Sequence, residues 1–223
     1  MGMRYTVFRM RLTKLGHSCV RLTKDSGTLV IDPGPLGDGA ASALDGADAV
    51  LITHEHWDHV DVDAVSAALG DNPGLTLWTH PSVAAQFGSY ASQVHEVHNG
   101  ESFDVAGFGI RVFGEDHARI HPDIPLIGNV GFLVDDQVFH PGDSFTVPAA
   151  PVDTLLVPVS GPWLKIGEMI DYYRAVSPAR GYAIHEAILN DAGLNIVDRM
   201  LGVAAQPSGT QLTRLTPGEA TNL

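Results

Sequence analysis

The chain has 223 residues, of which 44% are hydrophobic and 17% are charged. This balance is that of a globular protein and excludes an intrinsically disordered chain, and the length allows one or two domains with a large core. Lysine and arginine number 13 against 26 aspartates and glutamates, a net charge of −13. With no basic run to offset this charge, nucleic acid is excluded as a partner.

Cys19 is the only cysteine, which excludes an internal disulfide and a cysteine-rich zinc site. The first ten residues are broken by Arg4 and Arg9 and lack the continuous apolar core of a signal peptide. No apolar run is long enough to cross a bilayer. We therefore predict a cytoplasmic protein without a membrane partner.

Three short strands are predicted near the start of the chain, where apolar residues alternate or run together, at 11–15, 19–23 and 28–31. The third strand ends at Asp32-Pro33-Gly34. A weak helical segment at 40–44 then precedes a buried strand at 48–52.

The most informative stretch follows that buried strand: Thr53-His54-Glu55-His56-Trp57-Asp58-His59. Three histidines and an aspartate place metal-binding side chains where a strand enters a loop. The first two histidines are two positions apart and can point the same way, whereas Asp58 and His59 point to a different side. This geometry suits two metal ions better than one. The alternative is a solvated polar loop, but such loops are usually rich in Gly, Asn, Asp and Ser.

Strands and helices alternate through the rest of the chain. The expected helices are 61–70, 81–89, 166–176 and 190–201, and the expected strands are 75–79, 93–97, 101–105, 108–113, 129–134, 137–140, 154–159, 180–184 and 211–215. Residues from about Pro217 are expected to form a frayed tail. No repeat or convincing linker interrupts the pattern, so we predict a single domain over residues 1–223.

Residues 54–59 and the later Pro141-Gly142-Asp143-Ser144 resemble the metallo-β-lactamase superfamily. The loop 158–163 and the histidine after the next strand, His185, resemble the branch that contains L-ascorbate-6-phosphate lactonase. The resemblance covers residues 10–215. It implies an α/β fold, a four-layer αββα sandwich of two mixed β-sheets flanked by helices, with the metals at one edge.

The resemblance also implies a set of metal ligands. One metal is held by His54, His56 and His117, a second by Asp58, His59 and His185, and Asp143 bridges the two. A carboxylate can bind one metal through each of its oxygens, as a bridging ligand must. His117 is preferred to His121 because it directly ends the strand at 108–113.

Each of four further residues has two interpretations. Asp32 lies behind the metal site and holds a ligand histidine, or it merely begins a turn. His17 contacts substrate, as the lactonase-like relatives suggest, or is an ordinary strand-end histidine. His121 is a substrate contact or proton donor, or a surface-loop residue. Trp163 lines the substrate pocket or belongs to the core.

The implied function is hydrolysis of a lactone, ester, amide or phosphoester bond in a small molecule. Two cations lower the pKa of a shared water toward ~7, so that metal-bound hydroxide is the nucleophile. Asp58 has a catalytic role, in which it orients this nucleophile or moves its proton. Ligands without thiolate favour Zn²⁺, and Mn²⁺ or Fe²⁺ also suit them.

Two alternatives remain beside this hydrolase. One is a metal-binding protein without hydrolytic activity. The other is a di-iron redox relative of the same fold, against which His56 counts, because those relatives have an acidic residue at that position.

Overall fold

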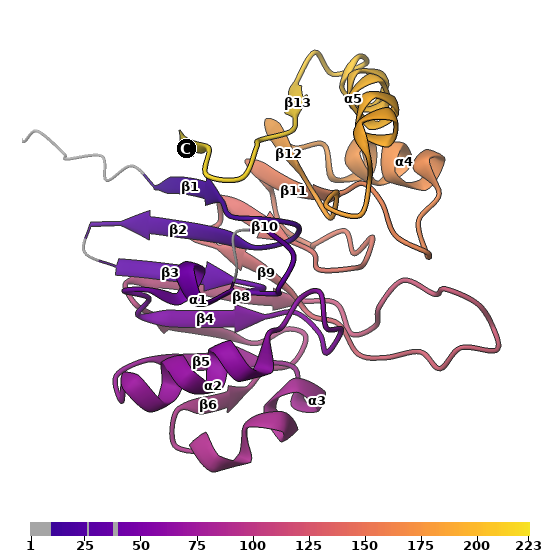
Figure 1. The fold of residues 1–223 in the computed structure, drawn as a ribbon. Coiled ribbons are helices and arrows are strands. Elements are labelled where there is room, and N and C mark those ends of the chain that lie inside the picture. The colour runs from indigo at the N-terminus through magenta and orange to yellow at the C-terminus, as the bar shows by residue number, and fades with distance from the viewer. Residues whose placement is uncertain (1–9, 26, 38–39) are drawn as a thin grey trace, which may run out of the picture.

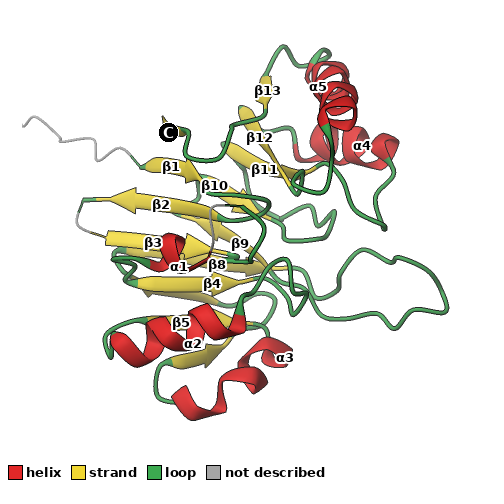
Figure 2. Cartoon of the chain, viewed as in Figure 1, coloured by secondary structure: helices red, strands yellow, loops and turns green. Residues whose placement is uncertain are grey.

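The computed structural model describes residues 10–25, 27–37 and 40–223, so the N-terminal stretch for which we expect no targeting signal lies outside it. Within the described residues the strands form two seven-stranded sheets (Figures 1 and 2). The first sheet has the order β14-β1-β2-β3-β4-β5-β6. Its strands are β1 (Arg11–Lys14), β2 (Val20–Lys24), β3 (Gly27–Ile31), β4 (Ala49–Ile52), β5 (Thr76–Thr79), β6 (Val94–Glu96) and β14 (Ala220–Asn222).

The second sheet has the order β13-β12-β11-β10-β9-β8-β7. Its strands are β7 (Ser102–Val105), β8 (Phe108–Phe113), β9 (Gly131–Val134), β10 (Val138–His140), β11 (Thr154–Pro158), β12 (Arg180–Ile184) and β13 (Gln211–Thr213). Both sheets are mixed, because an antiparallel set leads into parallel pairs, β3 to β6 in the first sheet and β10 to β13 in the second.

Helices cover the outer face of each sheet (Figure 1). They are α1 (Ala40–Leu44), α2 (Val62–Asp71), α3 (Pro81–Ala84) with the 3-10 helix η1 (Ala85–Tyr90), α4 (Ile166–Val176) and α5 (Asp191–Ala205). Residues of α1, α2 and η1 pack on the first sheet, and residues of α4 and α5 pack on the second. The predicted four-layer αββα sandwich is confirmed.

The apolar sequence of the inner strands explains the layers. In β4, Ala49 and Leu51 belong to the core between the sheets, whereas Val50 and Ile52 face the helices. Because successive side chains of a strand point to opposite faces, a strand buried on both sides must be apolar throughout. The continuous apolar run before residues 54–59, the histidine motif, is therefore a consequence of the central place of β4 in the sandwich.

The chain after about Pro217 corrects one expectation. It is not a frayed tail, because Ala220–Asn222 form strand β14, which pairs antiparallel with β1. The sequence Ala-Thr-Asn has no apolar alternation that would predict a strand, and its pairing with β1 supplies the structure. Among the described helices, none combines the length and apolar character that crossing a bilayer requires.

Candidate metal centre

The candidate site lies at the edge of the sandwich where several strands end. The residues concerned follow β1, β3, β4, β8, β10 and β12, and they are His17, Asp32, His54 to His59, His117, Asp143 and His185. These strands run in the same direction within each sheet, so their ends meet at one edge. Loops at the carboxyl ends of such strands commonly form binding sites.

Metal-binding atoms form two groups at this edge. In each group, one nitrogen or carboxylate oxygen of every member lies within 4.8 Å of the others. The first group is His54, His56, His117 and Asp143, and the second is His17, Asp58, His59 and His185. Every residue predicted as a ligand lies in one of the groups. The histidine motif is divided between them as the alternation of its side chains suggests.

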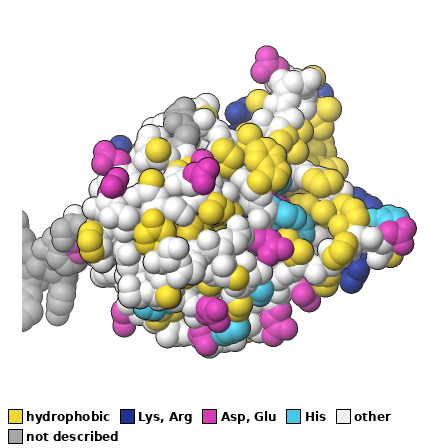
Figure 3. Space-filling model, turned by 60° about the horizontal axis from the view of Figure 1, so that its bottom comes forward, with side chains coloured by type: hydrophobic (Ala, Val, Ile, Leu, Met, Phe, Trp, Pro, Cys, Tyr) yellow, Lys and Arg dark blue, Asp and Glu magenta, His cyan; other side chains and the backbone are white. Residues whose placement is uncertain are grey.

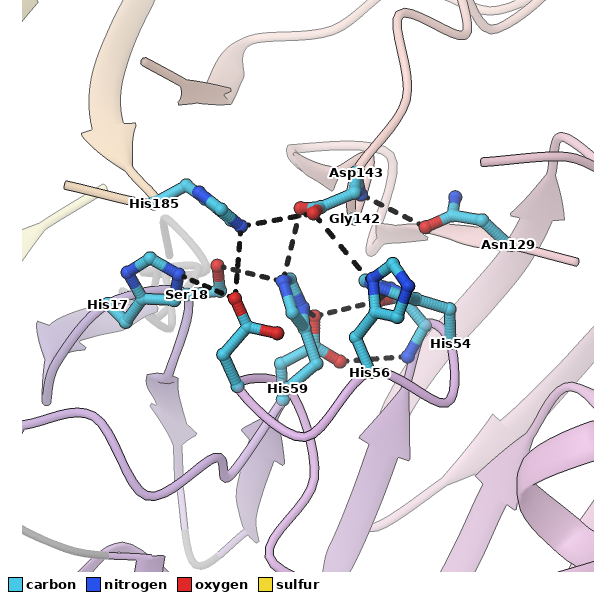
Figure 4. Close-up of polar contacts among 12 residues, drawn as sticks. His17, Ser18, His54, His56, His59, Asn129, Gly142, Asp143 and His185 are labelled. Carbon is cyan, nitrogen blue, oxygen red and sulfur yellow. Dashed lines mark hydrogen bonds and ion pairs between the residues drawn. The ribbon is translucent and has the colours of Figure 1, made fainter. Parts of the chain in front are cut away.

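Asp143 belongs to the first group and also lies next to histidines of the second (Figure 4). Its Oδ2 is 3.3 Å from Nε2 of His117 in the first group and 3.0 Å from Nε2 of His185 in the second. Its Oδ1 is 3.1 Å from Nε2 of His59. With only 2% of its surface exposed, this carboxylate has no access to water that would stabilise its charge.

The electrostatics of the site favour positive charge beside Asp143. Burial alone would raise the pKa of the Asp143 carboxyl, but neighbouring His59 holds that pKa well below its usual value. Burial alone would lower the pKa of His59, but the carboxylates of Asp143 and Asp32 raise it well above its usual value. A metal cation between these groups would stabilise the buried carboxylate charge in the same way.

Hydrogen bonds assign the protons of three rings. His59 donates from Nδ1 to Asp32 Oδ2 at 2.6 Å, and His117 donates from Nδ1 to the Ala118 carbonyl at 2.6 Å. The Thr53 hydroxyl donates to Asp32, so His54 Nδ1 must donate to Thr53 Oγ1 at 3.0 Å. In its neutral form each ring therefore keeps the Nε2 lone pair, as a metal ligand requires.

Several buried ring nitrogens of the candidate site have no hydrogen-bond partner among the described residues. Nε2 of His117 and both ring nitrogens of His185 are buried. Although both Nε2 atoms lie close to Asp143, none of these nitrogens makes a hydrogen bond of acceptable geometry within the described part of the chain. Such groups are costly unless something outside the chain binds them. The residues present therefore fit divalent metal ions.

Asp32 holds the loop that carries the histidine motif. It is fully buried and accepts hydrogen bonds from the backbone N–H and the hydroxyl of Thr53, both at 2.8 Å, in addition to His59. Gly34, two residues on, lies so close to the motif that a Cβ there would be 1.9 Å from the Asp58 backbone oxygen. The Asp-Pro-Gly sequence thus both turns the chain and supports the site.

Two residues fix the orientation of Asp143. The indole N–H of Trp163 donates to Asp143 Oδ2 at 3.0 Å, and Trp163 is only 6% exposed. The side-chain oxygen of Asn129 accepts from the Asp143 backbone N–H at 3.0 Å, and its amide donates to the Pro141 carbonyl at 2.9 Å. Asn129 was not anticipated. Its only signal in the sequence is a lone amide at the start of an apolar run.

His17 lies in the candidate site, whereas His121 lies outside it. His17 is buried in the second group, its Nε2 is 3.3 Å from Asp58 Oδ2, and burial lowers its pKa to about 4. His121 belongs to neither group. Its side chain is 60% exposed, and its Nδ1 accepts from the Asp123 backbone N–H at 3.2 Å.

A buried ion pair beside the site was also not anticipated. The Lys14 ammonium donates to both carboxylate oxygens of Glu186, at 2.8 and 2.9 Å, and to the His17 carbonyl. Lys14 is 1% exposed and Glu186 7%. The two residues lie 172 positions apart and link the first sheet to the loop after β12.

A cavity of about 230 Å³ borders the first group. His56 and His117 form one side of it. The remaining lining comes from the loop between β8 and β9 and is mainly apolar: Ala118, Arg119, Ile120, Ile124, Pro125, Leu126 and Ile127.

The fold and the two clustered ligand groups define the class of protein, an αββα-sandwich metallohydrolase. The family model described as "Beta-lactamase superfamily domain" matches residues 11–185, which is more than half of the chain. The chain belongs to that family.

Individual relatives agree with this assignment. Protein Rv0786c of Mycobacterium tuberculosis is 42% identical over 185 residues, covering 81% of this chain and 85% of that protein. A UPF0173 metal-dependent hydrolase of Methylobacterium nodulans is 30% identical over 156 residues, covering 60% of this chain and 63% of that protein. The solved structure of Igni18, a metallo hydrolase of Ignicoccus hospitalis, has a TM-score of 0.75 at 20% identity, covering 96% of this chain and 98% of that one. Igni18 supports the fold, and the Methylobacterium relative is described as a metal-dependent hydrolase.

Proposed function

We propose that this enzyme hydrolyses a lactone, ester, amide or phosphoester bond in a small molecule and resembles the L-ascorbate-6-phosphate lactonase branch in its chemistry. Two divalent cations would occupy the two ligand groups, and Zn²⁺ is preferred to Mn²⁺ or Fe²⁺. The observation that carries the proposal is the buried Asp143 carboxylate between those groups, within 3.3 Å of His117 and 3.0 Å of His185.

In this proposal His54, His56 and His117 would hold one ion, Asp58, His59 and His185 would hold the other, and Asp143 would be shared between them. Cations bound there would lower the pKa of a water molecule between them toward ~7 and polarise the bond under attack. Other residues of the chain orient the ligand side chains. Trp163 and Asn129 fix Asp143, and Asp32 fixes His59.

Asp58 is the proposed catalytic carboxylate, which would orient the attacking water or move its proton. Burial alone would raise the Asp58 pKa, but the hydrogen bond with His17 and the neighbouring His59 lower it to about 2. Asp58 is therefore ionised at neutral pH and able to accept a hydrogen bond. Its side chain is 16% exposed, so solvent and substrate can reach it.

The cavity beside His56 and His117 supports a substrate with an apolar substituent. Figure 3 shows hydrophobic side chains gathered around histidine that is visible at the surface, at the base of the protruding loop between β8 and β9. Ile124 and Leu126, which line the cavity, are 44% and 40% exposed. Large apolar side chains left open beside a polar centre are typical of a ligand site.

The first expected result concerns metal content and activity. Zinc-reconstituted protein should contain two ions per chain by mass spectrometry and hydrolyse at least one member of a panel of lactones, carboxylic esters and phosphodiesters. A chelator should abolish this activity, and added Zn²⁺ should restore it. His56→Ala should lose metal and activity, whereas His121→Ala should keep both. Two ions without hydrolysis would instead support a binding protein, and one ion would remove the dinuclear assignment.

The second expected result concerns the cavity. Straight-chain carboxylates from acetate to octanoate, titrated calorimetrically into the zinc-loaded protein, should bind more tightly with length. The gain should be about two- to fourfold per methylene, since a buried methylene contributes about 0.8 kcal/mol at most. Ile124→Asp should flatten this trend. Ile196→Asp, at a 59% exposed isoleucine on α5, is the matched control and should leave it unchanged. Affinity independent of length would exclude an apolar substituent.

A further inference from the structure

His17 stands out among the histidines of the second ligand group. It lies with Asp58, His59 and His185, and one of its ring nitrogens is close enough to theirs to share a metal ion. Proximity alone would therefore make His17 a further ligand. The hydrogen bonds of its ring point to another role.

Both ring nitrogens of His17 have partners. The backbone N–H of Ala187 donates to His17 Nδ1 at 3.2 Å, so this nitrogen presents its lone pair. A neutral imidazole that accepts at one nitrogen carries its proton on the other. Nε2 of His17 therefore carries the proton, and it lies 3.3 Å from Asp58 Oδ2, which accepts it.

This arrangement is the reverse of that in His59 and His117, two of the proposed ligands. His59 and His117 donate from Nδ1 and keep the Nε2 lone pair. If His17 bound a cation through Nε2, its proton would move to Nδ1 and face the Ala187 N–H, so two donors would oppose each other. A metal-binding His17 would thus lose its hydrogen bonds to both Ala187 and Asp58.

The backbone holds His17 in this orientation. Its carbonyl accepts the backbone N–H of His185 at 2.9 Å and also the ammonium of Lys14. Its ring lies against the ring of His185, with centroids 3.9 Å apart (Figure 4). Turning the ring over would replace both nitrogens by carbons at Ala187 and Asp58, so neither contact would survive.

We propose that His17 is a positioning residue that donates from Nε2 to Asp58 Oδ2 and is not itself a metal ligand. It fixes one oxygen of the Asp58 carboxylate and thereby directs the other oxygen and its lone pairs. The contribution of Asp58 to hydrolysis rests on the proposed function. The proton assignment of His17 stands apart from it, because it follows from the two contacts of the ring.

Nitrogen-15 NMR tests the assignment directly. Long-range correlation spectra of ¹⁵N-histidine-labelled protein, metal-free and zinc-loaded, should show a protonated Nε2 and an unprotonated Nδ1 for His17 in both states, with the His17→Gln variant identifying the signals. His59 and His117 should show the opposite assignment once zinc is bound. A protonated Nδ1 on His17 in the zinc-loaded protein would overturn the proposal.

Two variants separate positioning from ligation. His17→Gln keeps an N–H toward Asp58 and an oxygen toward Ala187, whereas His17→Leu removes both. With cobalt in place of zinc, both variants should bind two ions, and His17→Gln should keep the visible absorption of the wild type. For a substrate found in the panel, kcat should fall about 10- to 100-fold in His17→Leu, as is typical for such supporting residues, and recover in His17→Gln.

The opposite pattern identifies a ligand. Loss of one cobalt ion in both variants, or an altered absorption spectrum in His17→Gln, would show that His17 binds metal. If no substrate is hydrolysed, the proposed function fails, but the NMR and cobalt results still decide the role of His17.

Discussion

Replacing Asp143 with asparagine is expected to release both cations together and to abolish hydrolysis. Asparagine has nearly the same shape and can still accept from Trp163, and the backbone contact with Asn129 does not depend on the side chain. What is lost is the negative charge between the two ligand groups. Supporting residues behind a metal ligand already contribute 10- to 100-fold to affinity, so the loss for each ion should exceed about 100-fold.

Competition with a chromophoric chelator measures both affinities in the Asp143→Asn variant. Asp136→Asn is the matched control, because the Asp136 side chain is 70% exposed and pairs only with the half-exposed Arg111 in the described structure. It should leave metal content and turnover unchanged. Loss of a single ion from Asp143→Asn, with activity retained, would show that Asp143 belongs to one ion and does not bridge.

The part of the site that local sequence encodes could be predicted. The apolar run Ala49–Ile52 is central in its sheet and buried on both faces, so the residues that follow must emerge at the sheet edge. Asp143 and His185 were implied by the resemblance to the metallo-β-lactamase superfamily, and each also follows a buried strand. The structure brings these residues together, and their roles as ligands remain proposals.

The bond between Asp32 and a ligand histidine was one of two interpretations that the sequence offered for Asp32. The other hydrogen bonds that orient the site could not be predicted, because they join distant segments. The His17 ring is fixed by Ala187, 170 residues away, and Asp143 by the indole of Trp163. Strand β14 has the same origin, since β1 and not its own sequence determines it. Contacts between sequence-distant residues leave no periodic signal in a single chain.

The ion pair of Lys14 and Glu186 is a buried charge interaction outside the ligand groups. Burial lowers the pKa of the Lys14 ammonium, and the Glu186 carboxylate opposes this effect. The pair joins β1 to Glu186, the residue that follows His185. His185 has a strained backbone φ of 66°. The ion pair therefore lies directly beside a backbone conformation that is unusual for a residue other than glycine.

Lys14→Met should lower the free energy of unfolding by about 3–5 kcal/mol, because it leaves the Glu186 carboxylate buried without its partner. Urea denaturation of metal-free protein measures this change without a contribution from bound ions. The double variant Lys14→Met/Glu186→Gln should recover much of the loss, since no buried charge remains. Lys165→Met removes a lysine whose side chain is 83% exposed and should shift stability by less than about 0.5 kcal/mol. Equal effects of Lys14→Met and Lys165→Met would mean that water reaches the pair, and the link between β1 and the His185 loop would then not depend on its charge.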